Sequence, residues 1–367
     1  MGIGQCAMED LGMKSSFWLN KKVFITGQSG FKGGWLSLWL QSLGAEVTGF
    51  SLPPPTSPNL FEAANVADGM TSIIGDIRDE GHLTKAIKDS GAEVVIHMAA
   101  QALVRKSYID PVETYAINVM GTVNLLNAVR QCTTVKAVVN VTSDKCYENK
   151  NSDVPFVESD PMGGYDPYSN SKGCAELVTN AFASSYFNHK HYSEHGIALA
   201  SARAGNVIGG GDWAEDRLLP DIFRAIADDQ TVIIRNPNAI RPWQHVLEPL
   251  SGYLTLAKNL YLSGTKYSGG WNFGPQEEDT KTVGWMVDEI CQQWANNASW
   301  QISEGEHPHE ANYLRLNSNR AKSLLHWHSY WDTKQAIDYS VSWQKAYLNG
   351  DDMREFSLEQ ISNFREL

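Results

Sequence analysis

The sequence predicts an α/β fold, a doubly wound parallel sheet of the Rossmann-like kind with a smaller C-terminal lobe. Three observations support this prediction. Short β-rich runs alternate with segments of helical spacing through the first half of the chain, and this alternation is typical of a parallel sheet covered by helices on both faces. A glycine-rich turn follows the first run and opens the first helix. After residue 206 the alternation loosens, which predicts a second lobe.

The expected elements follow from the spacing of apolar residues. A β-rich run at 22–27 leads through the turn into a helix at 31–43. Further strands are expected at 46–50, 71–74, 93–97, 135–142 and 197–202, with helices at 83–89, 112–131 and 168–188. We assign 20–205 to the sheet domain, with segments near 231–262 and 270–275 returning to it, and assign 206–230 and 276–345 to the smaller, substrate-binding lobe.

The composition restricts the classes of partner. The chain has 367 residues, 42% of them hydrophobic, and a formal net charge of −12. It can therefore bury a large core, but the charge argues against nucleic acid or an anionic membrane as a partner. No apolar run approaches the roughly 18 to 20 residues of a membrane span, and residues 1–16 lack the apolar centre of a signal peptide. The five cysteines form no CxxC pair, which argues against a disulfide framework and favours a reducing cytoplasm.

The glycine turn reads Gly27-Gln28-Ser29-Gly30-Phe31-Lys32-Gly33. Between a strand and a helix, such a turn presents backbone N–H groups and the positive end of the helix dipole to a pyrophosphate. The alternative is a turn that only lets helix and strand approach closely. Residues 49–52, where the second strand ends, include neither an acidic residue for an adenosine ribose nor an arginine for a 2′-phosphate, so NAD is expected ahead of NADP by default.

Tyr168 and Lys172 stand four residues apart on an expected helix, and therefore on one face of it. The ammonium can lower the pKa of the phenol from about 10, which makes the phenol a base that takes a hydroxyl proton as a hydride leaves. Such a pair is common by chance. Its weight comes from the glycine turn and from polar residues at the ends of the fifth and sixth strands, at 142–145 and 203–206, because ligands bind at strand ends in such sheets.

Together these motifs resemble the extended short-chain dehydrogenase/reductase family over about 20–340. The resemblance rests on the glycine turn, Asp76, the run 97–101, the Tyr168 and Lys172 pair, and 203–206. Ser143-Asp144-Lys145 is similar to the signature of the family's sugar-nucleotide 4,6-dehydratases, with lysine in third place as in the CDP-glucose branch. Neighbouring phrases at 31–33, 143–149, 162–168, 240–245 and 307–311 are similar to the same branch. Two departures are Gln28-Ser29, where His-Thr is common, and Ser143, where Thr is usual.

The resemblance implies an NAD-dependent lyase that dehydrates CDP-glucose with no net redox change. C4 of the sugar is oxidised, water leaves across C5 and C6, and the hydride returns to C6. Tyr168 would take the 4-OH proton, Ser143 would hydrogen-bond that hydroxyl, and Lys172 would hold the nicotinamide ribose. Lys145 would remove the C5 proton and Asp144 would protonate the leaving 6-OH, both in unusual protonation states. Without the resemblance, an Asp–Lys ion pair at a strand end is the simpler interpretation.

The resemblance also assigns binding residues. The cofactor is expected to contact Gly27, Ser29, Gly30, Phe31, Lys32, Gly33, Asp76, Ile77, Ala99, Ala100, Gln101, Asn118, Tyr168 and Lys172. The substrate is expected to contact Asn206, Arg217, Leu218, Arg241, Asn272 and Tyr313. The two arginines would hold its phosphates through planar guanidinium groups. No metal is expected, because the His-x-His stretches at 307–309 and 326–328 lack a second cluster of suitable spacing.

Two other functions stay open. A sugar-nucleotide epimerase of the same family shares NAD, Tyr168 and Lys172 but needs no acid and base at positions 144 and 145, so Ser143-Asp144-Lys145 argues against it. A non-catalytic nucleotide sensor keeps the fold without the chemistry, and the intact Tyr168 and Lys172 pair argues against that. A homodimer is expected, because the helices at 112–131 and 168–188 carry apolar residues on more than one face and the family usually pairs through such helices.

Overall fold

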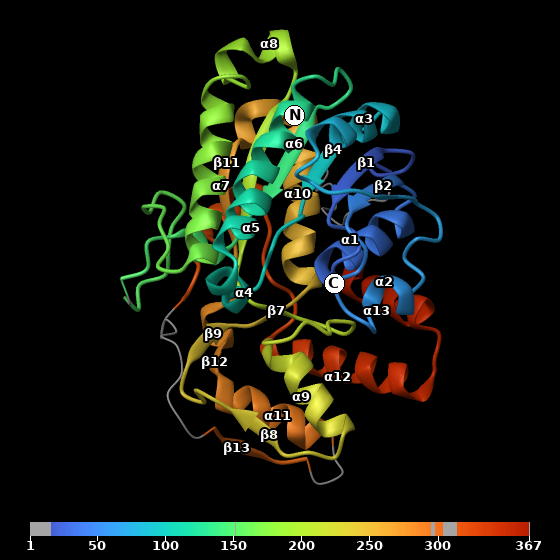
Figure 1. Ribbon diagram of the computed structural model, residues 1–367, viewed down its shortest axis with the longest axis vertical. Helices are drawn as coiled ribbons and strands as arrows, with labels where there is room; N and C mark the ends of the chain where they lie inside the picture. The colour runs from blue at the N-terminus through green and yellow to red at the C-terminus, as the bar shows by residue number, and fades with distance from the viewer. Residues whose placement is uncertain (1–15, 151, 295–297, 304–313, 367) are drawn as a thin grey trace, which may run out of the picture.

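The computed structural model describes residues 16–150, 152–294, 298–303 and 314–366. A seven-stranded parallel sheet runs through its larger part, in the order β11-β6-β5-β4-β1-β2-β3 (Figure 1). The strands are β1 (Lys22–Thr26), β2 (Glu46–Ser51), β3 (Thr71–Ile74), β4 (Val94–His97), β5 (Ala137–Val141), β6 (Ala198–Ala204) and β11 (Gly269–Phe273). The predicted parallel sheet is therefore confirmed.

The strand order reverses between β1 and β4. From β1 the sheet grows outward through β2 to β3, and on the other side it grows through β4, β5 and β6 to β11. Ile25 of β1 lies beside Gly49 of β2 and Ile96 of β4. Because sheets of this kind bind ligands at the carboxyl ends of the strands beside such a reversal, this edge is where a site is expected.

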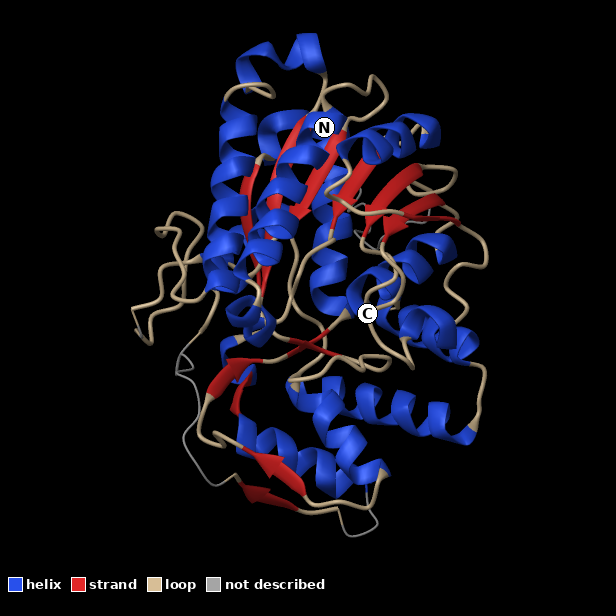
Figure 2. Cartoon of the chain, in the orientation of Figure 1, coloured by secondary structure: helices blue, strands red, loops and turns tan. Residues whose placement is uncertain are grey.

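Helices cover both faces of the sheet (Figure 2). One face carries α3 (Glu80–Ser90), α6 (Gly121–Val129) and α7 (Pro167–Ser184), and the other carries α1 (Phe31–Ser42), α10 (Leu247–Ser263) and α13 (Met353–Arg365). Successive strand residues alternate between the two cores, as the pleat requires. Phe24 and Val95 are buried in the core between the sheet and α3, α6 and α7, called here the α3 core. Ile25 and Ile96 are buried in the core on the opposite face, called here the α1 core.

The smaller lobe has a third core, which lies below the sheet in Figure 1. Its elements are α9 (Leu218–Ala227), α11 (Val283–Trp294) and two strand pairs, β8 (Val232–Ile234) with β13 (Trp300–Ile302) and β9 (Ile240–Pro242) with β12 (Thr280–Thr282). β7 (Val207–Ile208) pairs with β10 (Gln244–His245). α12 (Thr333–Asn349) joins the lobes, since Ile337 packs in the third core and Trp343 in the α1 core.

Two predicted segments differ in the structure. The segment 231–262, expected to return to the sheet domain, is divided: β8 and β9 pair with strands of the smaller lobe, and only α10 packs on the sheet. The division into domains itself stays a prediction. The helix expected at 112–131 consists of α5 (Pro111–Tyr115), a π-helical turn η1 (Ala116–Met120) and α6, because a π turn inserts a residue that apolar spacing does not reveal.

The remaining short helices are α2 (Leu60–Ala63), α4 (Val104–Ile109), η2 (Asp144–Cys146), η3 (His189–His191), α8 (Tyr192–His195), η4 (Gly264–Tyr267), η5 (Glu277–Asp279) and η6 (Ala321–Leu325). Among the described residues, none of the helices has the length and apolarity that crossing a membrane requires.

Candidate active site

A cavity of about 1300 Å³ lies at the carboxyl edge of the sheet and is also lined by the smaller lobe. It exceeds the roughly 300 to 1,000 Å³ typical of a pocket for one small molecule, so it has room for two ligands. The predicted residues that line it are Gly27, Ser29, Gly30, Phe31, Lys32, Gly33, Asp76, Ile77, Ala99, Ala100, Ser143, Asp144, Lys145, Tyr168, Lys172, Asn206, Arg217, Leu218 and Arg241. Gln101, Asn118 and Asn272 do not line the cavity, and Tyr313 lies outside the described residues.

Close backbone packing holds the glycine turn at two of its three glycines. Gly27 has a φ of +83°, where glycine is favoured, and a Cβ there would lie 2.8 Å from the backbone nitrogen of Ala99. A Cβ on Gly33 would lie 2.0 Å from the carbonyl oxygen of Gly27. At Gly30 the nearest atom would be 3.4 Å away. The fold therefore requires glycine at 27 and 33, whereas Gly30 has room for a Cβ and lines the cavity.

The first turn of α1 fits an anionic ligand. Gly30 precedes the helix without a side chain to cap it, and the first turn holds no acidic residue. Its first N–H groups are therefore available to a ligand, together with the positive end of the helix dipole. Lys32 adds a cation on the same turn and lines the cavity. These features suit the pyrophosphate of a dinucleotide.

The side chains of Gln28 and Ser29 are engaged within the sheet domain. Gln28 is buried, packs where a Cβ on Gly49 would lie, and donates to the Ser72 hydroxyl at 3.3 Å. Ser29 donates to the carbonyl oxygen of Leu52 and accepts a hydrogen bond from Ser51, both at 2.8 Å. The Gln28 side chain therefore does not reach the phosphate-binding space, and Ser29 ties the turn to the end of β2.

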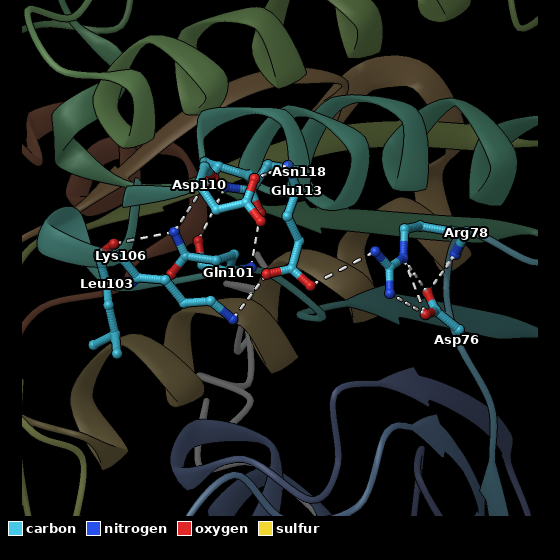
Figure 3. Close-up of polar contacts among 9 residues, drawn as sticks. Asp76, Arg78, Gln101, Leu103, Lys106, Asp110, Glu113 and Asn118 are labelled. Carbon is cyan, nitrogen blue, oxygen red and sulfur yellow. Dashed lines mark hydrogen bonds and ion pairs between the residues drawn. The ribbon is translucent and has the colours of Figure 1, made fainter. Parts of the chain in front are cut away.

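Asp76 follows β3 and is held by Arg78 (Figure 3). Arg78 Nε donates to both carboxylate oxygens at 3.0 Å, and the Arg78 backbone N–H donates to Oδ1 at 2.8 Å. These hydrogen bonds lower the pKa of the Asp76 carboxyl. An ionised carboxylate has lone pairs for a further donor, so Asp76 can still accept a hydrogen bond from an adenine amine.

Gln101 and Asn118 are buried and bind each other instead of lining the cavity (Figure 3). The Gln101 backbone N–H donates to Asn118 Oδ1 at 2.9 Å, and Asn118 Nδ2 donates to the Gln101 carbonyl at 3.0 Å and to the Ser171 hydroxyl at 2.9 Å. This pair fixes the loop after β4 against α7. The structure thus places both residues behind Ala99 and Ala100, which themselves line the cavity.

Ser143 and Asp144 extend from the carboxyl end of β5. Ser143 accepts a hydrogen bond from the Lys145 backbone N–H at 3.2 Å and donates to Asp144 Oδ1 at 3.0 Å. Asp144 is buried, and its Oδ2 has no hydrogen-bond partner among the described residues. Burial raises the pKa of the Asp144 carboxyl, against the opposing effect of Lys145. A buried carboxyl group that favours its protonated form suits a proton donor.

Tyr168 and Lys172 lie on the first turns of α7, which begins at Pro167 and is capped by Asp166. Both side chains are buried. Burial raises the pKa of Tyr168 to about 12, although a hydrogen bond with Ser143 acts in the opposite direction. Burial lowers the pKa of Lys172 to about 8. The expected lowering of the phenol pKa by Lys172 is therefore not seen in the ligand-free protein; the groups that lower this pKa are Ser143 and Arg217.

Lys145 points toward the same part of the cavity. Its ammonium lies 5.8 Å from the centre of the Tyr168 ring. Within the described part of the chain, no ion pair within 4.0 Å joins Lys145 to Asp144, but the Lys145 charge still acts on the Asp144 carboxyl. The two residues therefore interact through their charges without the close contact of an ion pair.

The smaller lobe supplies Asn206, Arg217, Leu218 and Arg241 to the cavity. Arg217 donates to Asp212 at 2.8 Å. Asn272, expected on the substrate side, is instead fully buried: it accepts a hydrogen bond from Tyr147 at 2.7 Å and donates to the Phe156 carbonyl at 2.9 Å. The family resemblance predicted a substrate contact for Asn272, but its amide forms hydrogen bonds within the fold instead.

Some lining residues escaped the sequence analysis. The segment 230–236 lines the cavity without any recognisable motif. Arg105 and Asp216 also line it and form an ion pair across it, which only the folded chain brings together. Among the described residues, no group of three or more His, Cys, Asp or Glu side chains is placed to hold a metal ion, and the stretch 307–309 lies outside them.

A sheet of this order, with a glycine turn and a Tyr–Lys helix at one cavity, defines a class of nucleotide-binding enzyme. The family model described as "NAD dependent epimerase/dehydratase family" matches residues 23–267, and the chain belongs to this family.

Individual relatives of the chain are more informative than the family model. The chain is similar to CDP-glucose 4,6-dehydratase of Salmonella typhimurium, with 55% identity over 95% of this chain and 97% of that protein. UDP-glucose 4-epimerase of Halalkalibacterium halodurans is 24% identical over 89% of this chain and 97% of its own. A solved structure of dTDP-glucose 4,6-dehydratase from Bacillus anthracis in complex with NAD has a TM-score of 0.73 at 21% identity, covering 90% and 98% of the two chains. This last likeness shows the fold alone.

Proposed function

We propose that the chain dehydrates CDP-glucose to CDP-4-keto-6-deoxyglucose, with NAD as a cofactor that is regenerated in each cycle. The 55% identity with a CDP-glucose 4,6-dehydratase supports this substrate. The observation that carries the reaction is that Asp144 and Lys145 line the same cavity as Tyr168 and Lys172. The first pair can perform an elimination and the second pair an oxidation, whereas an epimerase needs only the second.

The sheet side of the cavity fits NAD. The part of the cavity at Gly30 and the start of α1 would hold the pyrophosphate, Asp76 would accept from the adenine amine, and Lys172 would hold the nicotinamide ribose. NAD bound there supplies the acceptor for the C4 hydride and later returns that hydride. Gln101 and Asn118 position this wall of the site without lining it.

The oxidation of C4 depends on Tyr168. Its phenolic oxygen takes the proton of the sugar's 4-hydroxyl group. Ser143 hydrogen-bonds the 4-oxygen of the sugar as this oxygen becomes that of a ketone. With a pKa of about 12 in the ligand-free protein, the phenol needs a nearby cation to act as a base. Lys172, one helical turn along α7, can supply it once the ligands are bound, in addition to Arg217, whose charge already lowers this pKa.

The elimination uses the residues at the end of β5. The C4 ketone makes the C5 proton acidic, and Lys145 is the base that removes it. Asp144 then protonates the departing 6-hydroxyl group, a step favoured by the raised pKa of this carboxyl. Asn206, Arg217 and Arg241 hold the sugar diphosphate on the lobe side, where guanidinium groups match phosphate oxygens.

The direct test is to incubate the protein with CDP-glucose and NAD and to analyse the sugar nucleotide by mass spectrometry. A product that has lost one water and carries a 4-keto group is expected. An isomer of unchanged mass would favour the epimerase, and binding of both ligands without turnover would favour the nucleotide sensor.

We also propose a cytoplasmic homodimer. Exposed apolar side chains lie on α5, η1 and α7, and these three elements pack against one another. Val112 is 78% exposed, Met120 52% and Leu177 58%, and burying such residues between two copies is favourable. Light scattering should give twice the mass of the chain, and Val112→Glu should give the monomer. A monomeric wild-type protein would refute the assembly.

A further inference from the structure

Three consecutive residues of the short helix α4 contact three separate parts of the site. Arg105 Nη1 lies 2.8 Å from Asp216 Oδ1 in the smaller lobe. Lys106 pairs with Glu113 at 2.9 Å, and Glu113 pairs with Arg78, the partner of Asp76 (Figure 3). The Ser107 hydroxyl accepts a hydrogen bond from the Tyr168 backbone N–H at 3.1 Å. One turn of helix therefore contacts the substrate lobe and the tyrosine of the reaction directly, and it is linked to Asp76 through Glu113 and Arg78.

Asp216, which Arg105 contacts in the smaller lobe, directly precedes Arg217, a candidate for binding the substrate phosphates. Asp216 has a φ of +59°, a conformation that Asp and Asn tolerate better than most residues. Arg217 follows it at the start of α9 and bonds back to Asp212. The loop 212–217 is thus braced internally by one ion pair and joined to the sheet domain by the other. Arg105 and Asp216 both line the cavity.

We propose that Arg105 and Asp216 are positioning residues for the sugar nucleotide. Their ion pair holds the loop 212–217 against α4, so that Arg217 meets the substrate diphosphate at a fixed distance from Tyr168. This inference rests on the proposed function, because it assigns the positioning to a diphosphate that Arg217 binds. The pair is 47% and 37% exposed at its two side chains, and such pairs contribute little to the stability of a fold. Its effect should therefore appear in substrate binding.

The test compares Arg105→Gln, Asp216→Asn and the double variant with the wild type. Asparagine keeps the tolerance for positive φ at 216 and removes only the charge. Each single variant should raise the KM for CDP-glucose about tenfold, with kcat and the melting temperature nearly unchanged. The double variant should be no worse than either single one, because all three lose the same contact. Arg105→Lys should retain most of the affinity.

Lys85→Gln is the matched control, since Lys85 forms an exposed ion pair with Asp89 on α3, away from the cavity. An unchanged KM in Asp216→Asn, or additive effects in the double variant, would overturn the proposal even with an active wild-type enzyme. An inactive wild type would refute the proposed function instead. In that case, amide hydrogen exchange of loop 212–217 in the ligand-free protein still tests whether the ion pair holds the loop. Exchange should be faster in Arg105→Gln than in the wild type, and equal rates in the two proteins would overturn the proposal.

Discussion

The two sides of the cavity hold their functional groups by different means. On the sheet side, backbone geometry places the groups: glycines pack against backbone at 27 and 33, and Ser143 and Asp144 extend from the end of β5. On the lobe side, ion pairs between partly exposed side chains place them, as at Arg217 with Asp212 and at Asp216 with Arg105. The reacting groups are therefore fixed by the fold, whereas the positions of the substrate-binding groups depend on side-chain contacts that a single substitution can remove. Changes on the sheet side should therefore affect turnover, folding or cofactor binding, and changes on the lobe side should affect affinity for the substrate.

The largest effect is expected at Tyr168. Tyr168→Phe removes only the oxygen that accepts the 4-OH proton, so kcat should fall about 10² to 10⁴-fold while NAD and CDP-glucose still bind. Steady-state kinetics and calorimetric titration with both ligands check this. Turnover above a few per cent of the wild-type rate would remove Tyr168 from its role.

A pair of glycine substitutions separates folding from cofactor binding on the sheet side. Gly33→Ala forces a methyl group to 2.0 Å from the Gly27 carbonyl oxygen, so the free energy of unfolding should fall by about 2 to 4 kcal/mol. Gly30→Ala is its matched control, because the fold leaves 3.4 Å there. That variant should melt like the wild type and bind NAD more weakly. Equal melting temperatures for the two variants would contradict the view that the fold requires glycine at 33 but not at 30.

The lobe side is tested by Arg217→Lys, which keeps the charge but loses the planar, two-pronged donor. The KM for CDP-glucose should rise about tenfold with little change in kcat. A fall in kcat at constant KM would place Arg217 among the reacting groups and erase the contrast between the two sides.

The smallest expected effect is a dependence of stability on pH. Burial lowers the pKa of Lys172 to about 8 from 10.5, so between these values the unfolded chain binds more protons than the folded one, and stability rises with pH. From pH 7 to 9 the ligand-free protein should gain about 1 kcal/mol from this group. In denaturant titrations, the change in stability from pH 7 to 9 should be about 1 kcal/mol less favourable in Lys172→Met than in the wild type. Lys32, whose pKa burial also lowers to about 8, and Glu248, whose pKa burial raises to about 8, titrate in both proteins. An equal change in the two proteins would show that Lys172 does not titrate in this range.

The sequence predicted the sheet because strands such as β1, β4 and β5 are short, buried, mostly apolar runs with sharp ends. The predicted strand at 71–74 agrees with β3, and the turn and helix at 31–43 agree with α1 within one residue. The π turn at η1 was missed because it leaves the composition of the helix unchanged. Within 231–262, β8 and β9 pair with strands of the smaller lobe, which the sequence did not indicate because such strands have the same local pattern as strands of the main sheet.

The candidate site could be predicted where a motif has a recognisable position in the fold. Ser143, Asp144 and Lys145 follow a strand end, Tyr168 and Lys172 lie four residues apart on a helix, and all five line one cavity. Asn272 was misplaced, since a short apolar context does not show whether an amide faces a cavity or the interior. Arg105 and Asp216 could not be found, because 111 positions separate two ordinary surface residues that only tertiary packing joins.

The central claim is that Asp144 and Lys145 add an elimination to the oxidation by Tyr168, and Lys145→Met in deuterated water tests it most directly. Lys150→Met is the matched control, because Lys150 is 72% exposed and pairs only with Glu148 in the described structure. The account predicts that Lys145→Met folds and still oxidises C4, so that a 4-keto sugar with its 6-hydroxyl intact accumulates. Deuterium should not enter C5, whereas the control should form the dehydrated, labelled product. Dehydration by Lys145→Met at the wild-type rate per folded molecule would contradict the account.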